Sequence, residues 1–265
     1  MSQMNGFIPG EMLSVVKFVR GYRYLDRCGE ILLRLEDDLG DGWIPGEASP
    51  NAGIIRNVDM GMEVVFNSDS MTVRQRELVV DEQLIHTASR VYEIICGAIE
   101  IDHVLAPTLR TVFQKRCDSI VKADETLMMM GLVLPSGGLC EALGGEPSIQ
   151  HFTVVRETET TWEDLPVHCR VRINCIGSGQ FQQPPFDDRL VRRARTLPTR
   201  QNDALKQLLA FREKFVSANT FSTSLDIEYS FEDEFPFQVF QYREFLQHAL
   251  RNIQASASAL ARSKR

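Results

Sequence analysis

The spacing of hydrophobic residues changes several times along the chain, and each change predicts a change of secondary structure. Apolar residues recur at helical spacing over 21–39 and over 81–100, which predicts two amphipathic helices. Over 54–66 apolar and polar residues alternate, with the even-numbered side chains predicted to face inward. A turn at 67–70 and a return strand at 71–79 complete a predicted hairpin with one buried face.

The remainder of the first half is predicted to contain one loop, one strand and one short helix. The segment 43–49 contains proline and glycine and is predicted to be a loop. The alternation over 109–117 predicts a strand, and 119–132 is predicted to be a methionine-rich helix. Its run of three methionines at 128–130 is interpreted as core packing, with a cofactor-binding surface as the alternative.

A cluster of glycine and proline at 134–147 is the strongest break in the pattern and predicts a linker. Strands are predicted beyond it at 149–156, 167–176 and 221–231, and helices at 203–216 and 237–253. The first two of these strands are expected to pair as a hairpin. The Ala/Ser-rich tail that follows is expected to fray, as chain ends commonly do.

Both halves of the chain deliver strands and then a long amphipathic helix, which suggests a weak internal duplication. We therefore predict an α+β protein with two lobes, each a mostly antiparallel sheet covered by helices on one face. The predicted units are an acidic N-terminal lobe at 1–133, the Gly/Pro linker at 134–147 and a C-terminal lobe at 148–265. The pattern leaves open whether one sheet continues through both lobes.

The composition predicts an ordinary globular protein, because 43% hydrophobic and 25% charged residues can form a core without disulfides or metal. No stretch approaches the roughly 20 apolar residues that span a bilayer, and the first residues lack a signal-peptide pattern. Six cysteines are widely spread without a Cys-x-x-Cys pair and are interpreted as buried, reduced residues. We expect a soluble cytoplasmic protein with no cofactor, no metal and no membrane contact.

The net charge of −7 is unevenly distributed along the chain. Residues 1–133 contain 13 Lys/Arg and 20 Asp/Glu, whereas residues 134–265 contain 16 of each. An acidic chain disfavours sequence-independent binding to nucleic acid, because that affinity depends on Lys and Arg neutralising phosphate. The expected partner is therefore a protein, either a second copy or another chain, and nucleic acid is the alternative only where a local basic patch overrides the average.

One local concentration of positive charge follows Gly177-Ser-Gly179. Its members are Arg189, Arg192, Arg193, Arg195 and Arg200. Guanidinium groups match phosphate or carboxylate oxygens, and a glycine turn exposes backbone N–H groups, so we predict an anion- or partner-binding site here. The spacing is not that of a phosphate-binding or dinucleotide-binding loop. A solvated charged surface is the alternative interpretation.

Few residues are candidates for catalysis. His168 and Cys169 are neighbours on a predicted strand, so their side chains point to opposite faces and cannot form a nucleophile and base pair. Asp102, His103 and His151 could join a hydrolytic or metal site only through the tertiary fold, since the sequence contains no His-x-x-x-His or Gly-x-Ser-x-Gly motif. Asp226 and Glu228 begin an acidic stretch that either solubilises an exposed strand or binds a divalent cation.

The C-terminal part of the chain resembles a sporadically distributed bacterial family of uncharacterised proteins of similar length. The residues that carry the resemblance are Ser-Leu-Asp-Ile-Glu-Tyr at 224–229 and the following helix with His248, with looser matches at 70–92 and at Leu109-Arg110. Members of that family end on a Leu-Asp-Ile-Asp-type strand and a histidine-bearing helix. The family has no established activity, and its patchy distribution implies mobile or defence-associated gene clusters.

These observations favour a non-enzymatic binding or assembly subunit of a bacterial intracellular complex, for which the resemblance implies a role in antiviral defence. The absence of any motif with catalytic spacing is the reason for this prediction. The alternative is a hydrolase or nuclease-like enzyme whose site is assembled from both lobes, with His151, His168 and Asp226 as candidate residues.

Overall fold

The computed structural model describes residues 6–19, 21–76, 79–118, 122, 125–126, 130, 152–176 and 221–261. The strands of this part of the chain are β1 (Ile8–Phe18), β2 (Trp43–Ala48), β3 (Gly53–Asn57), β4 (Met62–Phe66), β5 (Ser70–Arg76), β6 (His103–Cys117), β7 (Phe152–Trp162), β8 (Leu165–Ile176), β9 (Phe221–Ser230) and β10 (Glu234–Pro236). The helices are α1 (Tyr24–Leu39), α2 (Asp81–Ile99) and α7 (Tyr242–Ala261).

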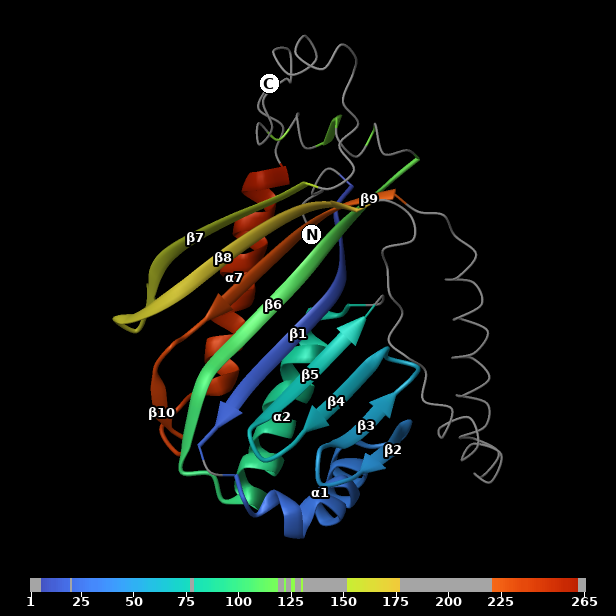
Figure 1. The fold of residues 1–265 in the computed structure, drawn as a ribbon, viewed down its shortest axis with the longest axis vertical. Coiled ribbons are helices and arrows are strands. Elements are labelled where there is room, and N and C mark those ends of the chain that lie inside the picture. Colours follow the sequence, from blue (N-terminus) through green and yellow to red (C-terminus); the bar gives the residue numbers. More distant parts are fainter. Residues whose placement is uncertain are drawn as a thin grey trace.

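All of these strands belong to one sheet whose neighbouring strands run antiparallel (Figure 1). The order is β2-β3-β4-β5-β1-β6-β9-β8-β7, and β10 pairs with β6 off this path. β6 pairs with β1 on one side and with β9 on the other, so a single sheet runs through both halves of the described chain. The predicted α+β class is confirmed. The linker at 134–147 lies outside the described residues, so the division into lobes there stays a prediction.

The helices α1, α2 and α7 cover the same face of the sheet, as Figure 1 shows. α1 packs beside α2 and against β3, and α2 packs beside α7 and against β5. α7 in turn packs against β6 and β9. The prediction of helices on one face is therefore confirmed, with the refinement that all of them cover one shared sheet.

The core lies between the sheet and these helices, because most buried apolar side chains of the strands belong to the face that the helices cover. On β1, Met12 and Val16 are buried, while Glu11 and Lys17 point to the other face. The rings of Trp162, Phe231, Phe240 and Phe245 lie within about 6.3 Å of one another and fill the space under α7. Packing against aromatic neighbours in this way holds the edge of the sheet to the helix layer.

A buried polar contact also connects the two halves. Ser14 of β1 and Tyr242 at the start of α7 share a hydrogen bond between their hydroxyl groups. Burial raises the pKa of the Tyr242 hydroxyl, so it stays protonated and able to donate. Four described cysteines are free. Cys28, Cys96 and Cys169 are buried, as predicted, whereas Cys117 near the end of β6 is only half-buried, so the prediction of burial is wrong for it.

The predicted helix at 81–100 is confirmed by α2, which ends at Ile99 and is followed by Glu100 in the left-handed conformation. The predicted helix at 237–253 begins and ends later, as α7. As far as Ala261 the tail is helical, so the prediction that it frays is wrong there: Ala249, Ile253, Ala257 and Ala261 recur every four residues and are all buried. Residues 262–265 lie outside the described residues.

Two predictions in the first half are wrong for local reasons. Residues 43–48 are not a loop but the edge strand β2, in which Pro45 is tolerated at a register shift because an edge strand needs fewer N–H donors. Residues 54–66 are not one strand but β3 and β4, joined by a turn at Gly61, whose φ is +61°. The turn resets the alternation, so Ile55 rather than Ile54 faces the core.

β1 has no counterpart among the predicted elements, although it is a central strand of the sheet. The predicted hairpin of the second half is confirmed as β7 and β8, which pair from Phe152–Cys175 to Trp162–Leu165. The predicted helix at 203–216 and most of the methionine-rich segment at 119–132 lie outside the described residues.

Candidate functional site

The face of the sheet opposite the helices, called the charged face below, carries ionic side chains at matching positions on successive strands. Glu157 of β7 lies opposite Arg170 of β8, Arg170 lies opposite Glu228 of β9, and Glu228 lies opposite Arg110 of β6. In the other half of the sheet, Arg74 of β5 lies opposite Glu63 of β4, and Glu63 lies opposite Arg56 of β3. The sign of the charge therefore alternates from strand to strand.

Glu11 of β1 joins these two series, because it contacts arginines of β5 and lies diagonally from Arg110. We call the complete row the charge ladder. It consists of Glu157, Arg170, Glu228, Arg110, Glu11, Arg74, Glu63 and Arg56. Side chains on one sheet face meet their cross-strand neighbours at about 5 Å, so the antiparallel register brings residues from both ends of the chain into one row.

The contacts within the ladder are direct. The Nε atom of Arg170 lies 2.6 Å from Oε1 of Glu157, and its Nη1 lies 3.5 Å from Oε1 of Glu228. The Nε atom of Arg56 lies 2.5 Å from Oε1 of Glu63. Such exposed pairs each contribute only about 0.2–1 kcal/mol to stability, so the ladder fixes the positions of charges more than it holds the fold together.

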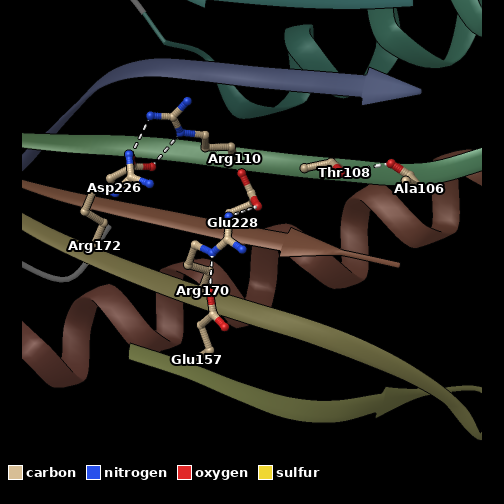
Figure 2. Close-up of polar contacts among 8 residues, drawn as sticks. All are labelled: Ala106, Thr108, Arg110, Glu157, Arg170, Arg172, Asp226 and Glu228. Atoms are coloured by element: carbon tan, nitrogen blue, oxygen red, sulfur yellow. Dashed lines mark hydrogen bonds and ion pairs between the residues drawn. The ribbon is translucent and has the colours of Figure 1, made fainter. Parts of the chain in front are cut away.

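The best-formed contact of the charged face joins Arg110 to Asp226. Arg110 donates two hydrogen bonds of 2.6 Å to Asp226, one from Nε to Oδ1 and one from Nη2 to Oδ2 (Figure 2). The Asp226 side chain is 8% exposed, whereas that of Arg110 is 34% exposed. The hydrogen bonds to Asp226 raise the pKa of Arg110, although partial burial acts in the opposite direction. This arginine is therefore charged and held in one orientation.

A small hollow of about 40 Å³, open to solvent, lies beside this pair. It is lined by Arg110, Arg170, Arg172, Asp226 and Glu228. Arg172 points into the same region from β8, with Nη1 3.9 Å from Oδ2 of Asp226, and donates no hydrogen bond to another described residue. Its guanidinium group therefore has donors that the described part of the protein leaves free. The hollow can accept a small polar group that brings its own oxygen atoms.

The candidate catalytic residues are not brought together. His168 and Cys169 do lie on opposite faces of β8, as predicted, and burial raises the pKa of the Cys169 thiol. His168 lies opposite Ser230 of β9, four residues from Asp226, which is about 13 Å along a strand. His151 lies outside the described residues.

His248 lies on the helix side of the sheet. Its Nε2 atom is 2.9 Å from Nδ2 of Asn252 and 3.5 Å from the Tyr229 hydroxyl, and its ring lies beside Trp162. Burial lowers the pKa of His248, and Arg251 lowers it further. The neutral imidazole is therefore the form that this environment favours.

Within the part of the chain that the structure describes, no group of three or more His, Cys, Asp or Glu side chains is arranged to hold a metal ion. A search of the same residues found no helix with the length and apolar character needed to cross a membrane.

The five arginines predicted as an anion- or partner-binding site, Arg189, Arg192, Arg193, Arg195 and Arg200, lie outside the described residues. The structure instead gathers three arginines from two strands that are far apart in sequence: Arg110 of β6, and Arg170 and Arg172 of β8. A signal for two of them is present: Arg170-x-Arg172 and Asp226-x-Glu228 occupy the polar positions of two strands with opposite charge. Only the pairing of β8 with β9 shows that these two pairs are neighbours.

No family model matches this chain, and a search of curated proteins also finds no match. The resemblance to the sporadically distributed bacterial family therefore stays a prediction.

Proposed function

We propose that the protein is a non-enzymatic binding or assembly subunit that docks a protein partner on the charged face. The observation that supports this proposal is the charge ladder, in which side chains of alternating sign are in register from β7 to β6 and from β5 to β3, and Glu11 of β1 joins the two series diagonally. A surface of this kind offers a partner a defined pattern of charges to match. Electrostatic complementarity of this type gives specificity and orientation more than raw affinity.

Binding is favoured over catalysis by the residues that catalysis would need. His168 and Asp226 are separated along the strands, and the Cys169 thiol is buried on the other face with a raised pKa. A nucleophile is activated by a neighbouring base or a lowered pKa, and neither condition is met at these positions.

The proposed setting is an intracellular complex of a bacterium, and the resemblance of the C-terminal part to a defence-associated family extends this to antiviral defence. Free cysteines support the reducing compartment that this setting implies. The near balance of signs along the ladder also fits a protein partner better than a nucleic acid, whose phosphates would meet the ladder's carboxylates.

The test inverts the pattern of charges without changing their number. In the double variant Arg56→Glu/Glu63→Arg, the cross-strand ion pair is kept but its direction is reversed. The tagged protein is purified from its host of origin after cross-linking, and its partners are quantified by mass spectrometry. We expect at least a tenfold loss of the partner, or about 1.4 kcal/mol. The melting temperature should fall only slightly, because the arginine placed at position 63 lies near Arg74.

The matched control is Arg90→Glu/Glu93→Arg, which reverses an exposed ion pair on α2, away from the charged face. This control should retain the partner. Equal recovery of the partner with both double variants would overturn the proposal, and so would a wild-type protein that is monomeric and partner-free under the same conditions.

A further inference from the structure

We propose that the hollow lined by Arg110, Arg170, Arg172, Asp226 and Glu228 binds a zwitterionic group, which carries an oxyanion and an N–H cation a few ångströms apart. The inference deepens the proposed function, on which it rests, by naming the chemistry that the charged face recognises. It is carried by the free donors, the fixed orientation and the charge balance of these residues.

The oxyanion half of the site is formed by Arg172 and Arg110. The Arg172 side chain is 42% exposed, and its guanidinium group makes no hydrogen bond to the described residues, only the ion pair of 3.9 Å with Asp226. Arg110 uses Nε and Nη2 for Asp226, which leaves the hydrogens of Nη1 for a ligand. Guanidinium donors in a fixed fork match the oxygens of a carboxylate or phosphate, so the two side chains can hold one such group.

Asp226 prepares this half of the site in advance. A carboxylate that is 8% exposed loses much of its hydration, and the bidentate contact with Arg110 compensates for that cost. Because Asp226 already fixes the Arg110 side chain, a ligand does not have to order it on binding. The entropy cost of ordering that side chain is therefore avoided, and the affinity is higher.

The cation half of the site is formed by Glu228. Its Oε1 atom is 3.5 Å from Nη1 of Arg170, which is longer than a good charge-assisted hydrogen bond, and its side chain is 27% exposed. Arg170 makes its short contact, 2.6 Å, with Glu157 instead. Glu228 therefore retains acceptor capacity toward the hollow, where an ammonium or amide N–H of a ligand can donate to it.

The balance of charge excludes a simple anion as the preferred ligand. The three arginines are matched by Asp226, Glu228 and Glu157, each of which contacts at least one of them. A bare phosphate would gain Arg172 but would be repelled by Glu228, whereas a zwitterion satisfies both. The hollow has a volume of about 40 Å³, which holds only a few water-sized groups, so the ligand group is small.

The experiment titrates small probes into the full-length protein and follows the arginine side-chain signals by NMR. The zwitterionic probes are phosphoethanolamine and β-alanine, and the probes that carry charge of one sign only are inorganic phosphate, acetate and ethylammonium. We expect saturable binding of a zwitterion with a Kd of about 1 mM or tighter, and at least tenfold weaker binding of the probes of one sign.

Two variants assign the halves of the site. Arg172→Gln should weaken the zwitterion about tenfold, because it removes a charge-assisted contact. Glu228→Gln should remove the preference for the zwitterion over the matching single anion. Arg90→Gln, on α2, is the control that should bind like the wild type, and thermal unfolding checks that each variant is folded.

Three outcomes would overturn the inference: no saturable binding of either zwitterion, equal binding of zwitterion and phosphate, or a zwitterion affinity unaffected by Arg172→Gln. If the probes do not bind but the double variant Arg56→Glu/Glu63→Arg still loses the partner, only this inference fails. If that double variant keeps the partner, the proposed function fails. Where the probe displaces the partner, the zwitterionic group belongs to the partner's side chains, and where both bind together it belongs to a free small molecule.

Discussion

The two faces of the sheet differ in what their side chains do, and strand β9 shows the difference within single steps of the chain. Leu225, Ile227 and Tyr229 are at most 1% exposed on the helix side, whereas Asp226 and Glu228 point to the opposite side and pair with arginines. Burial of apolar area is the main source of stability, and exposed ion pairs contribute little to it. The helix side therefore stabilises the fold, and the charged face is available for recognition.

The largest expected effect is the loss of an aromatic ring from the helix side. Phe245 of α7 is fully buried and contacts the rings of Trp162, Phe231 and Phe240. Phe245→Ala should lower the free energy of unfolding by about 3–5 kcal/mol, because it removes buried apolar area and leaves a cavity. Urea unfolding followed by circular dichroism measures this loss.

Leu33→Ala is the control for this substitution, because Leu33 is 63% exposed on α1. Its effect should stay within about 0.5 kcal/mol, as for other surface substitutions. A similar loss for both variants would mean that the space under α7 does not depend on this ring, and the comparison of the two faces would fail.

On the charged face, the largest expected effect comes from separating Asp226 from Arg110. Arg110→Met leaves a carboxylate that is 8% exposed without its bidentate partner. Breaking a buried pair costs about 3–5 kcal/mol, and because Arg110 is a third exposed we expect about 2–3 kcal/mol here. Urea unfolding of the variant at neutral pH measures it.

Arg172→Met is the matched control, since its contact with Asp226 is an ion pair of 3.9 Å without a hydrogen bond. It should cost less than about 1 kcal/mol. The double variant Arg110→Met/Asp226→Leu should be more stable than Arg110→Met alone, because it removes the stranded charge. If the double variant is the less stable of the two, the pair has a role other than compensating a buried carboxylate.

The helix side of the fold was largely predictable from sequence, because a continuous stripe of apolar side chains predicts a face that packs against the core. α2 and the inward residues of β8 follow directly from the spacing of their hydrophobic residues. β1 was missed, and it contains both Gly10 and a proline at position 9 near its start. The spacing of hydrophobic residues also assigned the wrong face of β3 to the core. The turn at Gly61 shifts the alternation by one residue between β3 and β4, and the sequence pattern does not show this shift.

The charged face was predictable only in part, because its site depends on which strands pair. The sequence places Arg170, Arg172 and Asp226 on outward positions of their strands, and that placement is correct. Arg110 and Asp226 are 116 residues apart, however, and no local pattern indicates that β6 and β9 are neighbours. Strand order is a property of the whole fold, so the hollow could not be derived from residue spacing.

A single ion pair within the ladder should have a smaller effect than the Arg110 contact. Glu63 contacts Arg56 at 2.5 Å and Arg74 at 3.8 Å, and its side chain is 24% exposed. Glu63→Gln should lower the free energy of unfolding by about 0.5–1 kcal/mol in low salt, and by less in high salt because exposed charges are screened. Glu93→Gln, from the helix-surface pair with Arg90, should cost no more than about 0.5 kcal/mol. A loss for Glu63→Gln as large as that of Arg110→Met would contradict the ranking.

The smallest expected effect is a pH dependence that comes from the helix side. Burial and Arg251 lower the pKa of His248 in the fold, so between that pKa and the unfolded value of about 6.5 the unfolded chain binds more protons. Stability should therefore fall as pH decreases through this window and then level off below the folded pKa. His248→Gln should flatten this part of the profile, measured as the free energy of unfolding by urea between about pH 7.5 and pH 5.

His86→Gln, at an exposed position of α2, is the control that should keep the wild-type slope. Profiles of equal slope for the wild type and His248→Gln would show that the pH response arises from other groups.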